Sequence, residues 1–173
     1  EINDVILITP RVYKDERGYF MESYNQKKVD KLIKDKFVQD NESVSGKNVL
    51  RGLHLQLPPF EQAKLIRVVK GSVLDVAVDL RKNSTTYGQH FKHLLSGENK
   101  KQLYIPKGFA HGFLSLEDDT ILYYKCSNYY HADSEDSIAW NDPVLAIDWG
   151  VPDPILAEKD RLAENFAKFE NPF

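Results

Sequence analysis

Residues Arg51–Asp79 read RGLHLQLPPFEQAKLIRVVKGSVLDVAVD, and this stretch decides the fold. Two runs rich in β-branched residues, Lys64–Val69 and Ser72–Asp79, flank the pair Lys70-Gly71. A short turn with a glycine, which can adopt a positive φ, is typical of a β-hairpin. We therefore predict a hairpin in which Val69 lies opposite Ser72.

The two faces of these predicted strands differ in character, because side chains alternate along a strand. One face is apolar except for Arg67, and the other mixes aliphatic residues with charges: Lys64, Ile66, Val68, Val73, Asp75, Ala77 and Asp79. Charged groups in an apolar interior are unfavourable unless they are paired or used. Two interpretations remain open at this point, a barrel with a polar cavity or a solvated face with an ordinary ion pair.

Length and charge narrow the class of protein. The 173 residues are most simply one domain, 1–173, with enough chain for a substantial core. The net charge of −3 comes from 23 basic and 26 acidic residues that are well mixed, which argues against nucleic acid or an anionic membrane as a partner. The single cysteine, Cys126, excludes a disulfide framework. With no long apolar run and no recognisable signal peptide, we expect a soluble cytoplasmic protein without a membrane partner.

The rest of the chain predicts an all-β fold with little helix. From Val49 to about Asn128, short apolar runs alternate with turn signals, as in a sandwich or barrel. Val5–Pro10 and Tyr19–Tyr24 are predicted strands, Phe37–Asn41 is predicted to be extended, and Ser43–Asn48 is a predicted polar loop.

Two helices are expected near the ends of the chain. Asn25 can cap a short N-terminal helix, in which apolar residues recur at helical spacing at Val29, Leu32, Ile33 and Phe37. Glu158–Phe169 is amphipathic and predicts a C-terminal helix.

A second hairpin is predicted around Asp118-Asp119. In that register His111 lies opposite Cys126 and Phe113 lies opposite Tyr124, so that His111 and Tyr124 share a face. Tyr124 is then either a functional group or a core tyrosine with a satisfied hydroxyl.

Gln56 is the residue that decides whether the sequence predicts a metal site. Pro106–His111 matches the P-x-G-x-x-H element of the cupin jelly roll, in which an earlier H-x-H and a Glu bind metal. Here that earlier element reads His54-Leu55-Gln56, with Glu61 further on. An amide is a poor ligand for a divalent metal, and Lys64 adds positive charge nearby. We therefore predict no metal, and we assign His54 and Lys64 to acid–base or oxyanion-stabilising chemistry.

Seven runs, in order along nearly the whole chain, resemble the dTDP-4-dehydrorhamnose 3,5-epimerase family. They are DERGYF (15–20), FVQDNESVS (37–45), NVLRGLHLQ (48–56), KLIRVVKGSVLDVAVDLR (64–81), IPKGFAHGF (105–113), WNDP (140–143) and AEKD (157–160). The resemblance implies a cupin-type jelly-roll barrel and a homodimer in which N-terminal strands reach into the partner's site. It also implies cofactor-free epimerisation of dTDP-4-dehydro-6-deoxy-D-glucose at C3 and C5.

The resemblance also implies roles for individual residues. His54 is the base, oriented by Asp160; Lys64 faces the C4 oxygen and Tyr124 reprotonates from the opposite side of the ring. We expect Asp75 and Asp79 to hold Lys64 in its charged form. Substrate binding falls to residues that match the family's binding positions, the first three of them contributed by the partner chain: Arg17, Phe20, Glu22, Gln39, Asn41, Arg51, Lys64, His111, Glu135 and Lys159. Tyr130 is a further candidate for the cavity wall.

Three departures from the family pattern, Leu55, Thr85 and Ala157, remove no group that does chemistry. Other functions remain open. One is a deoxysugar-nucleotide epimerase that acts at C3 or C5 alone. The others are a metal-dependent cupin isomerase or oxygenase and a non-catalytic sugar-nucleotide-binding protein.

Overall fold

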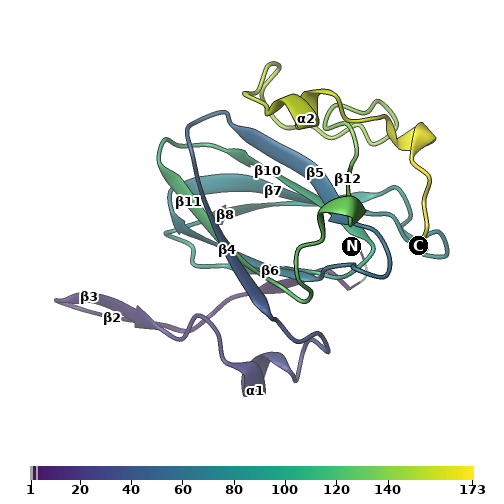
Figure 1. Cartoon of the computed structure of the whole chain (residues 1–173). Helices are drawn as coiled ribbons and strands as arrows, with labels where there is room; N and C mark the ends of the chain where they lie inside the picture. The colour runs from purple at the N-terminus through teal and green to yellow at the C-terminus, as the bar shows by residue number, and fades with distance from the viewer. Residues whose placement is uncertain (1, 3) are drawn as a thin grey trace.

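The computed structural model describes residues 2 and 4–173, and antiparallel strands packed as two sheets dominate it (Figure 1). One five-stranded sheet has the order β1 (Ile6–Ile8), β9 (Gln102–Ile105), β6 (Lys64–Lys70), β11 (Thr120–Cys126), β4 (Gln39–Ser45). The other has the order β12 (Glu135–Ser137), β5 (Leu50–Gln56), β10 (Phe109–Ser115), β7 (Ser72–Asp79), β8 (His90–Ser96). Two sheets facing each other in this way form the predicted jelly roll.

The hairpin predicted at Lys70-Gly71 is wrong, because β6 and β7 lie in different sheets. β6 pairs with β9 and β11, whereas β7 pairs with β8 and β10. The chain crosses between the sheets at Gly71, whose φ is +76° and where a Cβ would lie 3.1 Å from the Cα of Thr120. The predicted faces are nevertheless right for the core, since Ile66, Val68, Val73 and Ala77 all pack in one cluster between the sheets.

The second predicted hairpin is wrong for the same reason. β10 pairs with β5 and β7, and β11 pairs with β4 and β6, so no ladder joins His111 to Cys126. Phe113 and Tyr124 still contact the same core cluster from opposite sheets. The short connections at Gly71 and at Asp118-Asp119 therefore take the chain from one sheet to the other.

A second apolar cluster covers the outer face of the sheet that contains β5 and β7. Leu53, Val76 and Val78 point into it, and Trp149 and Phe166 cover it from the C-terminal part of the chain. Figure 1 shows this C-terminal segment, in green to yellow, lying along that sheet. The sheet is therefore buried on both faces, which explains its nearly continuous aliphatic sequence.

Helices are shorter than predicted. The N-terminal helix α1 covers only Gln26–Val29, with Asn25 at the N-cap position but without a side-chain cap bond. The predicted C-terminal helix reduces to α2 (Glu158–Arg161) and a 3₁₀ turn, η2 (Phe166–Lys168); a further 3₁₀ turn, η1, covers Ala132–Ser134. Between α2 and η2 the backbone of Glu164 accepts a bond of 2.8 Å from Ala139 N–H. This bridge requires an extended chain, so tertiary pairing overrides the helical pattern.

Two N-terminal features complete the fold. β4 extends through Ser45, so the predicted polar loop begins later than expected. β2 (Val12–Asp15) and β3 (Gly18–Met21) form a separate hairpin that projects from the two sheets (Figure 1). Within residues 2 and 4–173, no helix has the length and apolar character that crossing a membrane requires.

Candidate active site

A cavity of about 350 Å³ opens between the two sheets, and polar side chains line most of it. The lining residues come from β4, β5, β6, β11 and β12 and from the loops beside them: Gln39, Asn41, His54, Leu55, Gln56, Gln62, Lys64, Tyr124, Tyr130 and Glu135. His54 belongs to one sheet, and Lys64 and Tyr124 belong to the other. The three groups predicted to do chemistry therefore face one space from two opposite walls.

His54 is bonded to a buried carboxylate. Its Nε2 lies 2.5 Å from Oδ1 of Asp160, whose side chain is 1% exposed. Oδ2 of Asp160 accepts a longer bond, 3.4 Å, from the N–H of Gly52. Since an ionised carboxylate only accepts, we assign Nε2 as the donor of this bond, which leaves the lone pair of Nδ1 unused in the pair. α2 brings Asp160 to β5 across more than a hundred residues of sequence, so the pairing depends on the tertiary fold.

The backbone under this pair requires a glycine. Gly52 has a φ of +125°, and a Cβ on it would lie 2.5 Å from the Cα of Gly112 on the neighbouring strand β10. Only glycine allows β5 and β10 to approach this closely. The close approach places the N–H of Gly52 near Asp160 and places His54 two residues further along the strand.

Lys64 begins β6 with its ammonium group in the cavity. Burial lowers the pKa of Lys64 from its ordinary value, and the carboxylates of Asp75 and Glu135 only partly offset this effect. In the described part of the chain, no carboxylate oxygen lies within 4.0 Å of its Nζ, which is 6.0 Å from the ring centroid of Tyr124. A cation without an ion partner is available to a developing negative charge on a ligand.

Tyr124 lies in the middle of β11, between Asn41 on β4 and Ile66 on β6. Burial raises the pKa of its hydroxyl, so the group stays protonated and can donate a proton. Its ring also contacts the core cluster between the sheets. The ring of Tyr124 therefore packs in the core while the side chain lines the cavity, and its functional role stays a prediction.

The expectation that Asp75 and Asp79 hold Lys64 is wrong, because neither carboxylate forms an ion pair with its ammonium group. Both oxygens of Asp75 accept from Nε2 of His111 at 3.0 Å. Asp79 instead binds Arg81, Ser84 and Thr86 at the far end of β7. The error follows from the mistaken hairpin, since the predicted register placed these carboxylates beside Lys64.

His111 is not among the residues that line the cavity. It is 6% exposed, and burial lowers the pKa of its imidazole although Asp75 opposes the shift. β10 places its Cα opposite that of His54.

Other predicted binding residues gather at the cavity and its rim. Gln39, Asn41 and Glu135 line it, and Lys159 binds Glu135 at 2.7 Å. Arg51 lies outside the lining, where its guanidinium donates to Ser45 Oγ and to a backbone carbonyl of β4, both at 3.1 Å.

The structure does not bring Arg17, Phe20 and Glu22 to this cavity. Arg17 binds Asp15 within the β2–β3 hairpin, and Glu22 binds Lys28 at the end of α1. Phe20 is 70% exposed on the same hairpin, which Figure 1 shows standing away from the sheets.

Sequence reasoning missed three lining residues, Leu55, Gln56 and Gln62. The cupin motif interprets Gln56 only as a poor metal ligand, although its position two residues after His54 places it on the same strand face. Its amide binds backbone atoms of Phe60, Tyr129 and His131. Over the described residues, no group of three or more His, Cys, Asp or Glu side chains is arranged to hold a metal ion.

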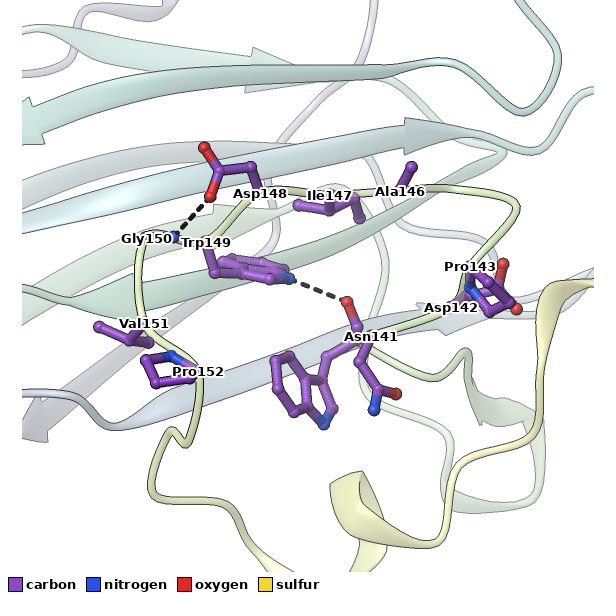
Figure 2. Close-up of a pocket in the computed structure, with 11 residues that line it drawn as sticks. Asn141, Asp142, Pro143, Ala146, Ile147, Asp148, Trp149, Gly150, Val151 and Pro152 are labelled. Atoms are coloured by element: carbon purple, nitrogen blue, oxygen red, sulfur yellow. Dashed lines mark hydrogen bonds between the residues drawn. The ribbon is translucent and has the colours of Figure 1, made fainter.

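A larger hollow, of about 580 Å³, lies on the loop 140–152. Figure 2 shows its polar groups bonded within the loop: the indole N–H of Trp149 donates to the carbonyl of Trp140, and Asp148 accepts from the N–H of Gly150. The carboxylate of Asp142 likewise accepts three backbone N–H groups. These bonds hold the loop, and none of the predicted catalytic groups lies there.

The sequence matches the profile of the dTDP-4-dehydrorhamnose 3,5-epimerase family over residues 1–168. The chain is 51% identical over 168 residues to the dTDP-4-dehydrorhamnose 3,5-epimerase of Shigella flexneri, with 96% of this chain and 93% of that protein covered.

Solved structures agree with the sequence match. The dTDP-6-deoxy-D-glucose-3,5-epimerase of Legionella pneumophila Philadelphia 1, in complex with dTDP-4-keto-L-rhamnose, aligns with a TM-score of 0.95 at 48% identity, covering 98% of this chain and 92% of that one. A 3'-monoepimerase from Streptomyces bikiniensis, in complex with dTDP-quinovose, aligns with a TM-score of 0.90 at 33% identity, covering 96% and 85%.

Proposed function

Since the chain belongs to the dTDP-4-dehydrorhamnose 3,5-epimerase family, we propose that His54, Lys64, Tyr124 and Asp160 perform the reaction of that family in the cavity between the sheets. The enzyme is an isomerase that converts dTDP-4-dehydro-6-deoxy-D-glucose to dTDP-4-dehydro-L-rhamnose by inverting C3 and C5.

The chemistry begins with a C–H bond next to the C4 ketone. His54 takes this proton at Nδ1, and the electron pair of the C–H bond moves into the carbonyl to give an enolate. Asp160, bonded to Nε2, stabilises the imidazolium that forms. The ammonium group of Lys64 stabilises the enolate oxygen.

Inversion requires a proton from the other face of the ring. Tyr124 donates it, and the enolate carbon regains a C–H bond with the opposite configuration. One observation carries this assignment: His54 lies on β5 of one sheet and Tyr124 on β11 of the other, while both line the same cavity. A sugar ring between the two walls would present opposite faces to the base and the acid.

The binding roles follow the chemistry of a nucleoside diphosphate. Arg51 and Lys159 supply charge for phosphate oxygens, and Gln39, Asn41 and Glu135 supply hydrogen bonds to the sugar or base. We assign His111, bonded to Asp75, to the same binding set.

We assign Arg17, Phe20 and Glu22 to the site of a second copy in a homodimer. Their distance from this chain's own cavity and the exposure of Phe20 support that arrangement. On this proposal, residues 1–173 form one domain of a cytoplasmic enzyme that needs no cofactor.

The test is isotope exchange. We expect the wild-type enzyme, incubated with dTDP-4-dehydro-6-deoxyglucose in D₂O, to introduce deuterium at both C3 and C5, read by NMR of the recovered sugar. His54→Ala should abolish exchange, whereas Tyr124→Phe should keep exchange but lose inversion. His90→Ala, on β8 outside the cavity, is the matched control and should behave as wild type.

Each alternative has its own outcome in this assay. Deuterium at a single carbon would show a single-centre epimerase, and no exchange at either carbon would contradict the proposed chemistry. Full activity of metal-free enzyme in the presence of chelator would exclude a metal-dependent isomerase, and loss of activity under chelator would favour it.

A further inference from the structure

Three glutamine side chains of the cavity wall bind the backbone of one short segment, residues 128–131. We call Gln39, Gln56 and Gln62 the glutamine clasp. The bonds are Gln62 Nε2 to Asn128 O (2.8 Å), Gln56 Nε2 to Tyr129 O (3.2 Å), Tyr130 N to Gln39 Oε1 (2.9 Å) and His131 N to Gln56 Oε1 (2.8 Å). Each residue of the segment thus gives one backbone group to the clasp.

The segment needs these bonds because it lies outside both sheets. β11 ends at Cys126 and η1 begins at Ala132. Ser127 N–H still donates to Ala63 O, but among the described residues no strand pairs with 128–131. Backbone N–H and C=O groups require partners when water does not serve them. A glutamine amide offers both a donor and an acceptor and can replace a neighbouring strand.

The segment forms one wall of the cavity through Tyr130. The Tyr130 hydroxyl donates to Glu135 Oε2 at 3.2 Å, and the tyrosine is 56% exposed beside the cavity. The ring of His131 stacks on Phe60, with centroids 3.8 Å apart and planes 3° from parallel. Phe60 O in turn accepts from Gln56 at 2.6 Å, so the clasp also holds the loop beneath this stack.

We propose that the glutamine clasp positions the Tyr130 wall against the bound dTDP-sugar and thereby sets substrate affinity. Gln56 and Gln62 are then positioning residues for binding, and Gln39 combines this role with the direct ligand contact proposed above. The inference rests on the proposed function for its substrate, but the clasp itself can be tested without turnover.

The structure separates this wall from the reacting groups. His54, Lys64 and Tyr124 are held in strand ladders on both sides of the cavity, and none of them has a hydrogen bond to the 128–131 segment. Loosening the wall should therefore change KM while kcat stays nearly constant.

Gln62 offers the cleanest test, because it lies in a loop before β6 and its side-chain amide donates to Asn128 O. Gln62→Leu removes the donor to Asn128 O, and Gln62→Glu replaces it with a repelling oxygen. We expect KM for the dTDP-sugar to rise roughly two- to tenfold, as for one lost hydrogen bond, and more for Glu than for Leu. kcat should stay within about twofold. Gln89→Leu, an exposed glutamine on the far side of β7, should change neither constant.

Two further readouts distinguish positioning from general destabilisation. In a Tyr130→Ala background, Gln62→Leu should raise KM no further, because the side chain that the clasp positions is already gone. Hydrogen–deuterium exchange of the peptide that covers 128–131 should speed up in Gln62→Leu, whereas peptides of β5 and β11 should keep the wild-type rate.

Three results would overturn the proposal. They are a fall in kcat at unchanged KM, an effect of Gln62→Leu that persists in full in Tyr130→Ala, and unchanged exchange at 128–131. If wild-type enzyme shows no turnover, the proposed function fails by itself, and the exchange measurement still decides the clasp.

Discussion

Replacing Lys64 with methionine should stabilise the fold while it removes activity. Lys64 places an ammonium group in the cavity with no ion partner within 4.0 Å among the described residues. Methionine keeps an unbranched side chain that can pack along the same path without a charge. The folded variant would no longer carry the free-energy cost of desolvating a charge. It would also lack the group that stabilises the enolate oxygen.

The magnitude follows from the position of Lys64. Replacing a buried ion pair with apolar side chains can stabilise proteins by about 1–4 kcal/mol, because the cost of desolvating the charges is removed. The low end applies here, about 1–2 kcal/mol, because the cavity is open on one side and Asp75 and Glu135 provide some compensation. For a domain of this size, that corresponds to a rise in Tm of about 3–6 °C. Loss of an oxyanion-stabilising group should lower kcat roughly 10²–10³-fold.

The stability gain should depend on pH with a definite sign. Burial lowers the pKa of Lys64 in the folded protein below the ordinary 10.5. Above that lowered pKa the unfolded chain binds more protons than the folded one, so wild-type stability rises with pH up to the ordinary lysine range. The methionine variant lacks this titration. The difference in Tm between variant and wild type should therefore be largest near pH 7 and should narrow toward pH 9.5.

Differential scanning calorimetry at pH 7 and pH 9.5 tests this, together with turnover of the dTDP-sugar. Lys27→Met, at an exposed position on α1, is the matched control and should leave Tm and turnover near wild type. A Tm for Lys64→Met at or below that of wild type would refute the reasoning. So would a difference in Tm that does not narrow as the pH rises.

Three further predictions concern residues around the cavity and at the far end of the barrel. Asp160→Asn should lower kcat about 10- to 100-fold by weakening a charge-assisted bond to His54, with a change in Tm below about 3 °C; steady-state kinetics and a thermal melt check both. Asp79→Asn should lower the free energy of unfolding by about 2 kcal/mol at pH 7. Although burial opposes it, bonds led by Arg81 lower the pKa of Asp79 to about 2, so this stability is lost as pH falls from about 4 through 2; urea unfolding at pH 7 and pH 2.5 should show the difference shrink to about a third. Gly52→Ala should destabilise the protein by about 3 kcal/mol or more, measured by urea unfolding, because a Cβ would collide with the neighbouring backbone; wild-type stability would contradict the close approach.

The alternation of side chains between the two faces of a single strand was predictable from the sequence. The identity of the strands that pair with each other was not. Ile66, Val68, Val73 and Ala77 were assigned to one face, and they do meet in one core cluster. That assignment needs only the period of a strand. The hairpins failed because a turn at Gly71 is compatible both with a hairpin and with a crossing between sheets. The packing of the whole barrel, which no local pattern encodes, selects the crossing.

The same limit explains the errors at the carboxylates and the C-terminal helix. Asp75 was placed beside Lys64 through the mistaken register, whereas it binds His111. Residues 158–169 have a helical apolar pattern, but the backbone of Glu164 pairs with the segment at Ala139 and keeps the chain extended. Both outcomes depend on residues that are remote in sequence.

Residue types and motif order were sufficient to indicate the β architecture, the family, and His54 and Lys64 as candidates, because these depend on short-range pattern and chemistry. The resemblance to the family then implied the roles of Tyr124 and Asp160. The tertiary structure alone decided that His54 and Tyr124 face each other from opposite sheets and that Gln56 holds a loop in place of a metal ligand. It also brings Asp160 to His54, a pairing that the resemblance implied but no local pattern could show. The physical reason is that each of these contacts joins segments far apart along the chain, and only the packing of the complete barrel fixes their distance.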